Sequence, residues 1–266
     1  MLNVAMFGAS GRMGRAIVAL VVESADLRLS GALAAEDDPQ IGHDAGVVSG
    51  VAPVAVAITS DPLRALADAT VVIDFTLPAA SLAHARHCQA RSVPMVIGTT
   101  GHDAAGRAEI SRIAGDIPIV MAPNMSLGVN LLFKLAELAA RALDPDYDAE
   151  IFEAHHRHKV DSPSGTALGL GNAVARGRGT SLEQSAVYAR HGATGPRPRG
   201  AIGFSVVRGG DIVGDHRVIF AGPGEQVELA HHAQDRSGFA RGALAAARWI
   251  VGRPPGLYSM MDVLGL

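Results

Sequence analysis

The sequence predicts an α/β protein in which a doubly wound parallel sheet is followed by an α+β domain with a mixed or antiparallel sheet. Three observations predict this fold class. The first half of the chain alternates short Val/Ile/Ala runs with amphipathic stretches, the pattern of parallel strands whose two faces are covered by helices. A glycine-rich turn follows the first apolar run. Beyond residue 124 the apolar runs are longer and are separated by Gly-Gly or Gly-Pro-Gly, which is typical of antiparallel strands.

Each element of the first half follows from this alternation. Buried strands are expected where apolar residues cluster without polar alternation, at residues 2–7, 27–33, 54–58, 70–75, 94–97 and 117–121. Helices are expected at about 12–23, from Asp61, at about 78–90 and at about 104–114. Strand–helix alternation at this spacing predicts a Rossmann-like domain.

The second half begins with a long helix that Ser126 is expected to cap and that reaches about Ala142. Four of its leucines fall near one stripe, namely Leu127, Leu131, Leu135 and Leu138. After a strand at about 150–154, three runs are expected to form an antiparallel meander, at residues 201–208, 212–221 and 225–233. A helical tail at about 237–251 is expected to return to the first domain. The predicted domains are therefore residues 1–125 with 237–266, and residues 126–236.

The composition excludes several classes of protein. The chain has 266 residues, 48% of them hydrophobic and 18% charged, and a formal net charge of −3. This composition is globular, and no basic field suggests nucleic acid or an anionic membrane as a partner. The single cysteine, Cys88, excludes a disulfide framework within the chain and a cysteine-rich zinc site. Without a signal-peptide pattern or an apolar run of about 20 residues, the expected location is the cytoplasm.

The glycine-rich turn runs from Gly8 to Gly14 with the spacing G-x-x-G-x-x-G. Glycines let backbone N–H groups approach a diphosphate, and the helix start adds partial positive charge. A tight turn without a ligand is the alternative, but the position after a first strand favours dinucleotide binding, and a Walker A loop is excluded. Glu36 and Asp37 follow the second strand, either as partners of the ribose hydroxyls or as solvated loop charges.

A cationic cluster follows the strand at 150–154. It consists of His155-His156-Arg157-His158-Lys159 and is followed by Ser164-Gly165-Thr166 at an expected helix start. Helix-start amides bind carboxylates, a lysine supplies charge and a proton, and a histidine exchanges protons near neutral pH. The cluster therefore predicts a site where a small dianionic substrate receives a hydride and a proton.

Other interpretations of this cluster fit the residues less well. A solvated basic loop would not explain why five basic residues follow one another directly. A zinc site is disfavoured because adjacent histidines rarely point at one metal and no cysteine is near, so no metal is expected. His231-His232 lies in a strand, where neighbours point to opposite faces, and is expected to be superficial or packed. The chain has neither the Tyr-x-x-x-Lys pair of short-chain dehydrogenases nor the G-x-S-x-G elbow of hydrolases.

These residues resemble the dihydrodipicolinate reductase family along nearly the whole chain. The most specific match is the stretch from Glu153 to Ala167, EAHHRHKVDSPSGTA. The other matching stretches are Val4–Gly14, Asp74-Phe75-Thr76, Gly98-Thr99-Thr100-Gly101, Ala122–Ser126 and Gly128-Val129-Asn130.

The resemblance implies that NADH or NADPH delivers a hydride to C4 of (2S,4S)-4-hydroxy-2,3,4,5-tetrahydrodipicolinate, with loss of water, in lysine biosynthesis by the diaminopimelate pathway. It places His155 at the proton donor/acceptor position and Lys159 at a second proton donor, with His156, Gly165 and Thr166 at the substrate carboxylates. The implied cofactor contacts are Gly8, Ala9, Ser10, Gly11, Arg12, Met13, Gly98, Thr99, Thr100, Ala122, Pro123, Asn124 and Met125. The residues 1–125 with 237–266 would bind the dinucleotide, and residues 126–236 would bind substrate and form a homotetramer.

One departure from the family bears on the cofactor. Ala34 stands where the family commonly has an acidic residue after the second strand, although Glu36 is near. We therefore expect both NADH and NADPH to be used. Two competing hypotheses are a nicotinamide oxidoreductase acting on a sugar or amino acid, and a dinucleotide-sensing module without catalysis. A neutral sugar does not need the cationic loop, and a sensor does not need a proton donor.

Overall fold

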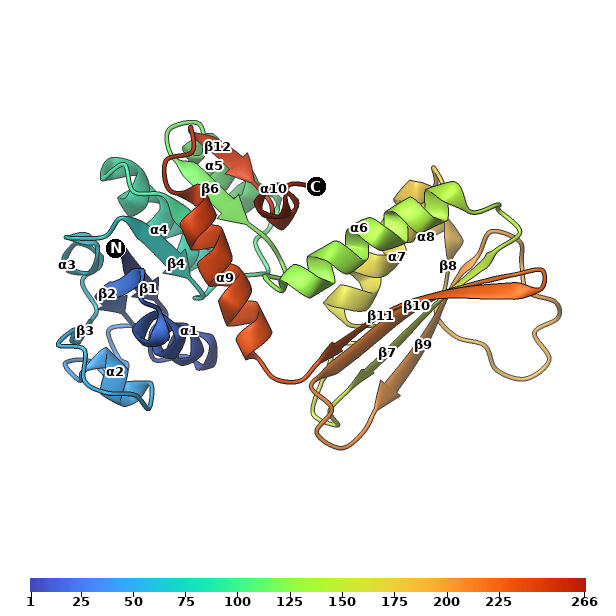
Figure 1. Ribbon diagram of the computed structural model, residues 1–266, viewed down its shortest axis with the longest axis horizontal. Coiled ribbons are helices and arrows are strands. Elements are labelled where there is room, and N and C mark those ends of the chain that lie inside the picture. Colours follow the sequence, from blue (N-terminus) through green and yellow to red (C-terminus); the bar gives the residue numbers. More distant parts are fainter. The chain divides into compact units, whose positions relative to one another are not determined.

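A computed structural model describes all 266 residues of the chain and divides it into two compact units. The first unit contains Met1–Leu127 and Arg236–Leu266, and the second contains Gly128–Asp235 (Figure 1). None of the helices combines the length and the apolar character needed to cross a bilayer.

The first unit is built on a seven-stranded sheet with the order β12-β6-β5-β4-β1-β2-β3. Every pair of neighbours in it is parallel, which confirms the doubly wound sheet. Its strands are β1 (Leu2–Phe7), β2 (Leu27–Leu33), β3 (Ile58–Thr59), β4 (Val71–Asp74), β5 (Met95–Ile97), β6 (Pro118–Met121) and β12 (Gly256–Tyr258). The edge strand β12 was not predicted, because three residues after a proline pair carry no periodicity that identifies a strand.

Helices cover both faces of this sheet. They are α1 (Arg12–Glu23), α2 (Ala45–Val48), α3 (Pro62–Leu66), α4 (Pro78–Ala90), α5 (Ala104–Ile113), α9 (Ser237–Ile250) and α10 (Met260–Leu264). On one face Val4 and Met6 of β1 pack in a core with α1 and α9. On the other face Ala5 and Phe7 pack with α4 and α5. The helical tail therefore packs on this sheet, as predicted.

The strand predicted at residues 54–58 is wrong for most of its length. Only Ile58 and Thr59 pair with β2. Ala55 has a positive φ of 58°, which breaks the extended path. The amide of Val54 donates instead to the Asp44 carboxylate, at 3.1 Å. In this segment a hydrogen bond to a side-chain carboxylate therefore takes the place of pairing with a neighbouring strand.

The second unit has a five-stranded mixed sheet with the order β11-β10-β7-β9-β8. Its strands are β7 (Asp148–His155), β8 (Ala186–Val187), β9 (Ile202–Arg208), β10 (Gly214–Gly222) and β11 (Glu225–Ala233). The predicted meander is wrong, because β7 lies between β9 and β10 and pairs parallel with the first and antiparallel with the second. Only β10 and β11 form the expected hairpin. The central position of β7 pairs both of its edges and places its carboxyl end between two strands.

Helices α6 (Leu127–Ala142), α7 (Gly165–Gly177) and α8 (Leu182–Ser185) accompany this sheet. The leucine stripe expected on α6 does not face the core: Leu131, Leu135 and Leu138 are exposed. The buried face carries Val129, Asn130 and Leu132, followed by the smaller Ala136 and Ala140 toward the end of the helix. Small residues allow close helix packing, and a Cβ at Gly177 of α7 would collide with the α6 backbone. Close packing against α7 therefore favours small buried residues at this end of α6.

Candidate active site

The carboxyl end of β7 places two ionisable side chains on the core-facing side of the sheet. Along this strand Ala149, Ile151, Glu153 and His155 share one face, because side chains alternate with a period of two. The first two join the core between the sheet and α6 and α7. Glu153 is fully buried and His155 is 9% exposed. Strand β7 therefore places a carboxylate and an imidazole beside the hydrophobic core of the second unit, at the carboxyl end of the strand.

Glu153 is the centre of a hydrogen-bonded cluster. Its Oε2 lies 2.6 Å from Nδ1 of His155. Arg208, at the end of β9, donates to both carboxylate oxygens at 2.8 Å, and the amide of Ser164 donates to Oε1 at 2.9 Å. Buried charges are stable when they are paired and fully hydrogen-bonded, and Glu153 meets that condition.

His216 of β10 completes the cluster. It lies opposite Glu153 in the antiparallel register, and its Nε2 is 3.1 Å from the Ser164 hydroxyl. Its ring packs edge-on against His155, with centroids 5.0 Å apart. The sequence did not identify Glu153, Arg208 or His216 as site residues. The even spacing of Glu153 and His155 was the available signal, whereas Arg208 and His216 come from strands whose order the sequence did not reveal.

The surroundings set the charge of these groups. Burial lowers the pKa of His155 and Glu153 raises it, and the balance lies below the ordinary value. Burial raises the pKa of Glu153, but hydrogen bonds from Arg208, His155 and the Ser164 amide outweigh this effect, so its pKa is lowered. At neutral pH the pair is therefore a carboxylate beside a neutral imidazole.

We expect His216 to make the protein acid-sensitive. Burial, followed by the nearby His155, lowers the pKa of His216 from 6.5 to about 4. Between these values the unfolded chain binds a proton at His216 and the folded chain does not, so stability falls as the pH falls from 6.5 to about 4. The loss from this residue is about 3 kcal/mol.

Urea unfolding across this pH range measures the effect. His216→Asn should be less stable at pH 7 but should lose less stability on acidification than the original protein. His232→Asn, at an exposed histidine on β11, should keep the original slope. An unchanged slope in His216→Asn would contradict the assignment.

The loop after β7 holds the remaining cations. Lys159 pairs with Asp161, with Nζ 2.8 Å from Oδ1, and its side chain is 22% exposed. The rings of His156 and His158 lie 6.3 Å apart. The amide of Lys159 donates to the carbonyl of His156, so the loop makes a tight turn. Lys159 is thus near solvent with an exposed counter-ion that a bound carboxylate can replace.

Helix α7 begins directly after this loop. Ser164 is its N-cap and accepts from the amide of Ala167 at 3.2 Å. Gly165 and Thr166 form the first two helical positions, and Gly165 is exposed. The structure therefore brings His155, Lys159 and this helix start together on one unit, as segments that follow one another at the end of β7.

The glycine-rich turn of the first unit has the geometry of a phosphate-binding turn. Gly8 adopts a φ of +84°, and the amides of Gly8 and Ala9 donate to the carbonyl of Leu33. A Cβ on Gly14 would overlap the carbonyl oxygen of Gly8. Helix α1 starts at Arg12 after Gly11, with no side-chain cap on its first turn. The open helix start can therefore receive a diphosphate.

Two of the predicted cofactor side chains in this turn differ in their surroundings. Ser10 donates its hydroxyl to Asp38, with an O–O distance of 2.5 Å. Met13 packs against the core of the first unit. Asp38 was not selected from the sequence, which offered Glu36 and Asp37 instead, and both of these are solvent-facing.

The loops after β4 and β5 are joined by a buried carboxylate. Asp74 accepts hydrogen bonds from the hydroxyls of Thr76 and Thr99, at 2.8 and 2.6 Å, and lies 2.7 Å from Nδ1 of His84. The Thr76 amide in turn donates to the Thr99 hydroxyl. Gly98 lies against the ring of Phe75, where a Cβ would not fit. Hydrogen bonds to Asp74 and from the Thr76 amide therefore fix the side chain of Thr99, a predicted cofactor residue.

Four predicted cofactor residues line one cavity of about 600 Å³ in the first unit: Thr99, Thr100, Ala122 and Pro123. Tyr258 and Arg107 line the same cavity and were not predicted. Asn124 accepts from the Ser126 amide at 2.9 Å, and Met125 is buried. The cavity and the glycine-rich turn lie at the carboxyl edge of the same parallel sheet, where doubly wound folds bind ligands.

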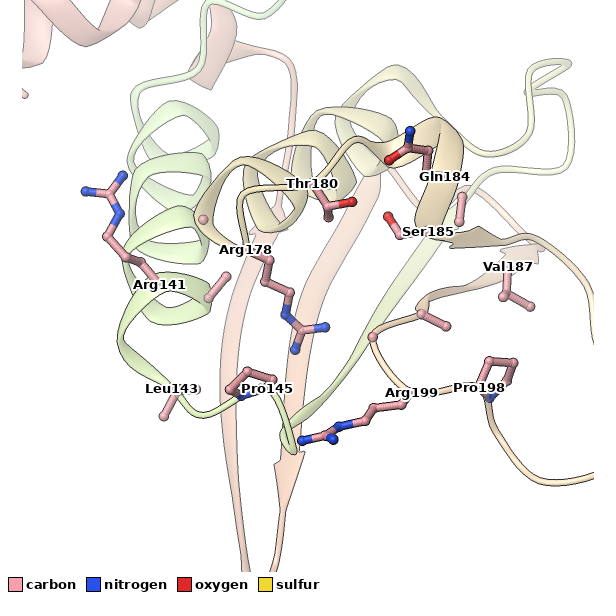
Figure 2. Close-up of a pocket in the computed structure, with 15 residues that line it drawn as sticks. Arg141, Leu143, Pro145, Arg178, Thr180, Gln184, Ser185, Val187, Pro198 and Arg199 are labelled. Atoms are coloured by element: carbon pink, nitrogen blue, oxygen red, sulfur yellow. The ribbon is translucent and has the colours of Figure 1, made fainter.

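A second cavity, of about 720 Å³, lies in the second unit and contains none of the predicted residues. Figure 2 shows Arg178 pointing toward Pro145 and Arg199, whereas Arg141 points away. Arg199 is paired with Asp146 at 2.6 Å, and Arg178 donates to the carbonyl of Tyr147. The second amino group of Arg178, Nη1, is buried without a hydrogen-bond partner. None of the predicted site residues lines this cavity, and the candidate site remains at the end of β7.

The other histidine pair of the sequence, His231-His232, lies on β11. No group of three or more His, Cys, Asp or Glu side chains is arranged to hold a metal ion. His231 and His232 occupy opposite faces of β11, and His232 pairs with Asp215 at 3.0 Å.

Comparison with known proteins gives matches to both units. The family model described as "Dihydrodipicolinate reductase, N-terminus" matches residues 2–125, and its C-terminal counterpart matches residues 128–264. The chain belongs to the dihydrodipicolinate reductase family. Its N-terminal unit is accordingly a Rossmann-type nucleotide-binding domain, and the resemblance inferred from the sequence is confirmed.

Individual members of this family align over the whole chain. A 4-hydroxy-tetrahydrodipicolinate reductase from Thiobacillus denitrificans is 56% identical, covering 99% of this chain and 98% of that protein. One from Nitrosomonas europaea is 53% identical, covering 100% and 98%. A dipicolinate-bound dihydrodipicolinate reductase from Paenisporosarcina sp. TG-14 has a TM-score of 0.79 at 26% identity, with 98% of both chains covered.

Proposed function

We propose that the protein reduces 4-hydroxy-tetrahydrodipicolinate to tetrahydrodipicolinate, with loss of water and with NADH or NADPH as the hydride source, in lysine biosynthesis by the diaminopimelate pathway. The observation that carries this proposal is the site at the end of β7, where a buried Glu153–His155 pair adjoins Lys159 and the start of α7. The chain is also 56% and 53% identical, over nearly its full length, to two reductases named for this substrate, which supports the proposal.

The site residues would have separate tasks. Lys159, His156 and the helix start at Gly165 and Thr166 would bind the two carboxylates of the substrate, because they supply cations and helix-start positions. Lys159 would also donate a proton. His155 would exchange a proton or a hydrogen bond with the substrate.

The first unit fits a nicotinamide dinucleotide. The diphosphate would lie on the turn formed by Gly8, Ala9, Ser10, Gly11, Arg12 and Met13, whose glycines allow the close backbone contacts that shape the turn. The nicotinamide side would be held by Gly98, Thr99, Thr100, Ala122, Pro123, Asn124 and Met125, several of which line the cavity of about 600 Å³. When bound, the nicotinamide supplies a hydride.

Asp38 is expected to influence the choice between NADH and NADPH. The Ser10 hydroxyl and the Gln40 amide lower the pKa of Asp38, so an ionised carboxylate is held against the cofactor turn. We expect both nucleotides to be used, and Asp38→Asn to raise the NADPH/NADH ratio of kcat/KM about fivefold, or about 1 kcal/mol, by removing repulsion of the 2′-phosphate.

Steady-state kinetics with the two nucleotides tests this expectation. Asp37→Asn, one residue earlier and exposed, should leave the ratio unchanged. The same ratio in Asp38→Asn as in the unmodified protein would exclude Asp38 from cofactor choice, and a hundredfold preference of the unmodified protein for NADH would exclude dual use.

A direct assay tests the reaction itself. The purified protein would be mixed with NADPH or NADH and the condensation product of pyruvate and aspartate semialdehyde, and the absorbance at 340 nm followed. Oxidation of the nucleotide that depends on the condensation product is expected. Oxidation with a sugar or amino acid but not with this substrate would favour another oxidoreductase, and nucleotide binding without turnover would favour a sensor.

Assembly as a homotetramer through the sheet of the second unit is part of this proposal. The face of this sheet opposite α6 and α7 carries Phe152 and Ile219, both partly exposed, together with the exposed Val207. Arg217 lies over the Phe152 ring at 5.1 Å. A partly apolar open sheet face is suited to sheet packing. Light scattering on the purified protein should give four times the chain mass, and we propose the cytoplasm as its location.

A further inference from the structure

Only one ring nitrogen of His155 has a hydrogen bond to the protein. Its Nδ1 hydrogen-bonds to Glu153 at 2.6 Å, and this is the ring nitrogen engaged by the protein. The other nitrogen, Nε2, lies against Gly214 at the start of β10, where an added Cβ would be 3.1 Å away. Gly214 therefore lies close to Nε2, and any side chain at residue 214 would crowd this nitrogen.

The partners of Glu153 determine which nitrogen of His155 carries the proton. Arg208 occupies both carboxylate oxygens as a donor, and an arginine has no acceptor. The Ser164 amide is also a donor. A carboxylate surrounded by these donors accepts from every neighbour, so the Nδ1 atom at 2.6 Å must be an N–H. Arg208 is itself fixed, because it donates to the carbonyls of Val207 and Asp161.

We propose that Glu153, held by Arg208 and the Ser164 amide, is a positioning residue that keeps the proton of His155 on Nδ1 and presents Nε2 to the substrate as an acceptor. This inference rests on the proposed function and assigns the working nitrogen of the site. It follows the general rule that the hydrogen bond of one ring nitrogen sets the protonation of the other.

The two proton-handling residues then differ in their resting state. Unprotonated Nε2 accepts from an O–H or N–H of the substrate. To act as an acid, His155 must first take up a proton at Nε2, and the resulting imidazolium is stabilised by Glu153. Lys159 carries only donors, so the first proton given to the substrate comes from Lys159. The charged groups that face His155 are Glu153, Lys159 and Arg208, with the neutral His216 packed beside it.

Nitrogen-15 NMR of the full-length protein without substrate tests the tautomer directly. At neutral pH the ring of His155, assigned by its loss in His155→Asn, should show a protonated Nδ1 and an unprotonated Nε2. The opposite tautomer would overturn the proposal. Because this measurement needs no turnover, its result is independent of whether the proposed reaction occurs.

Kinetics of matched variants test the positioning role. Glu153→Gln replaces an acceptor oxygen by an NH₂ group and should lower kcat about 100-fold, with little change in substrate KM, because ring orientation is lost. Glu150→Gln is the control. Glu150 lies on the same strand and binds Arg190 and Arg197, but it points to the other face. A kcat of Glu153→Gln within about threefold of the original, or an equal loss in Glu150→Gln, would contradict the proposal.

A third variant acts on Nε2 without changing Glu153. Gly214→Ala should crowd Nε2, lower kcat and keep the Nδ1–H tautomer in the NMR spectrum, whether or not Glu153→Gln folds. Full activity of Gly214→Ala would show that Nε2 does not face the substrate.

Discussion

Replacing Lys159 by alanine is expected to lower kcat about a thousandfold, because a general acid contributes between about 10² and 10⁴ to a rate. In the structure its ammonium is paired with the exposed carboxylate of Asp161. A rise in substrate KM should accompany the loss, because the same ammonium neutralises a carboxylate. The measurement is steady-state kinetics with the condensation product as substrate.

The chain offers a matched control for this variant. Lys134 on α6 is the other lysine of the sequence, since the remaining cationic residues are arginines. Lys134→Ala should retain the original kcat and KM. Lys159→Arg is informative as well, because a guanidinium keeps the charge but does not release a proton near neutral pH. It should restore KM more than kcat. Full kcat in Lys159→Ala would remove Lys159 from the mechanism.

Replacing Gly14 by alanine is expected to abolish productive nucleotide binding. A Cβ at this position would overlap the carbonyl oxygen of Gly8 and the backbone of Ala9, neither of which is a flexible side chain. The turn must move, and overpacking of this kind costs about 3 kcal/mol of folding free energy. A displacement of about 1 Å in a binding turn lowers turnover about 100-fold.

Calorimetry with NADPH and thermal unfolding measure the two effects separately. Gly238→Ala is the matched control, since Gly238 lies in α9 with no atom within 4 Å of an added Cβ. Alanine there should keep nucleotide affinity and stabilise the helix by up to about 1 kcal/mol. Unchanged nucleotide affinity in Gly14→Ala would show that this turn is not part of the cofactor site.

The sequence predicted the first unit better than the second for a physical reason. A parallel sheet buried on both faces gives continuous apolar runs, and these located β1, β2, β4, β5 and β6. Strand order in a mixed sheet depends on contacts between distant segments. The runs at 201–208 and 212–221 are close in sequence, but β7 lies between them. The buried face of α6 was predicted wrongly for a related reason, because the close approach of α7 near Ala140 depends on a contact between separate segments.

The site was predicted in the same uneven way. His155, Lys159, Gly165 and Thr166 follow one another in the chain, so a single motif revealed them. Glu153 stood inside that motif, yet its role depends on Arg208, which is 55 residues away. Asp38 and Tyr258 likewise gain significance only from neighbours brought close by folding.

The position of Glu153 and His155 on β7 has a consequence for the timing of motions in the site. Glu153 pairs with both β9 and β10, and His155, at the end of the strand, pairs with β9, so their amides should exchange with solvent more slowly than those of the loop that follows. Lys159 belongs to a loop whose neighbour Val160 is 97% exposed, and this loop should open locally and often. Hydrogen exchange should therefore be slow at the amide of His155 and fast at the amide of Lys159, only four residues later. In proton transfer, His155 would stay fixed through each turnover, while Lys159 would move toward the substrate and away from it.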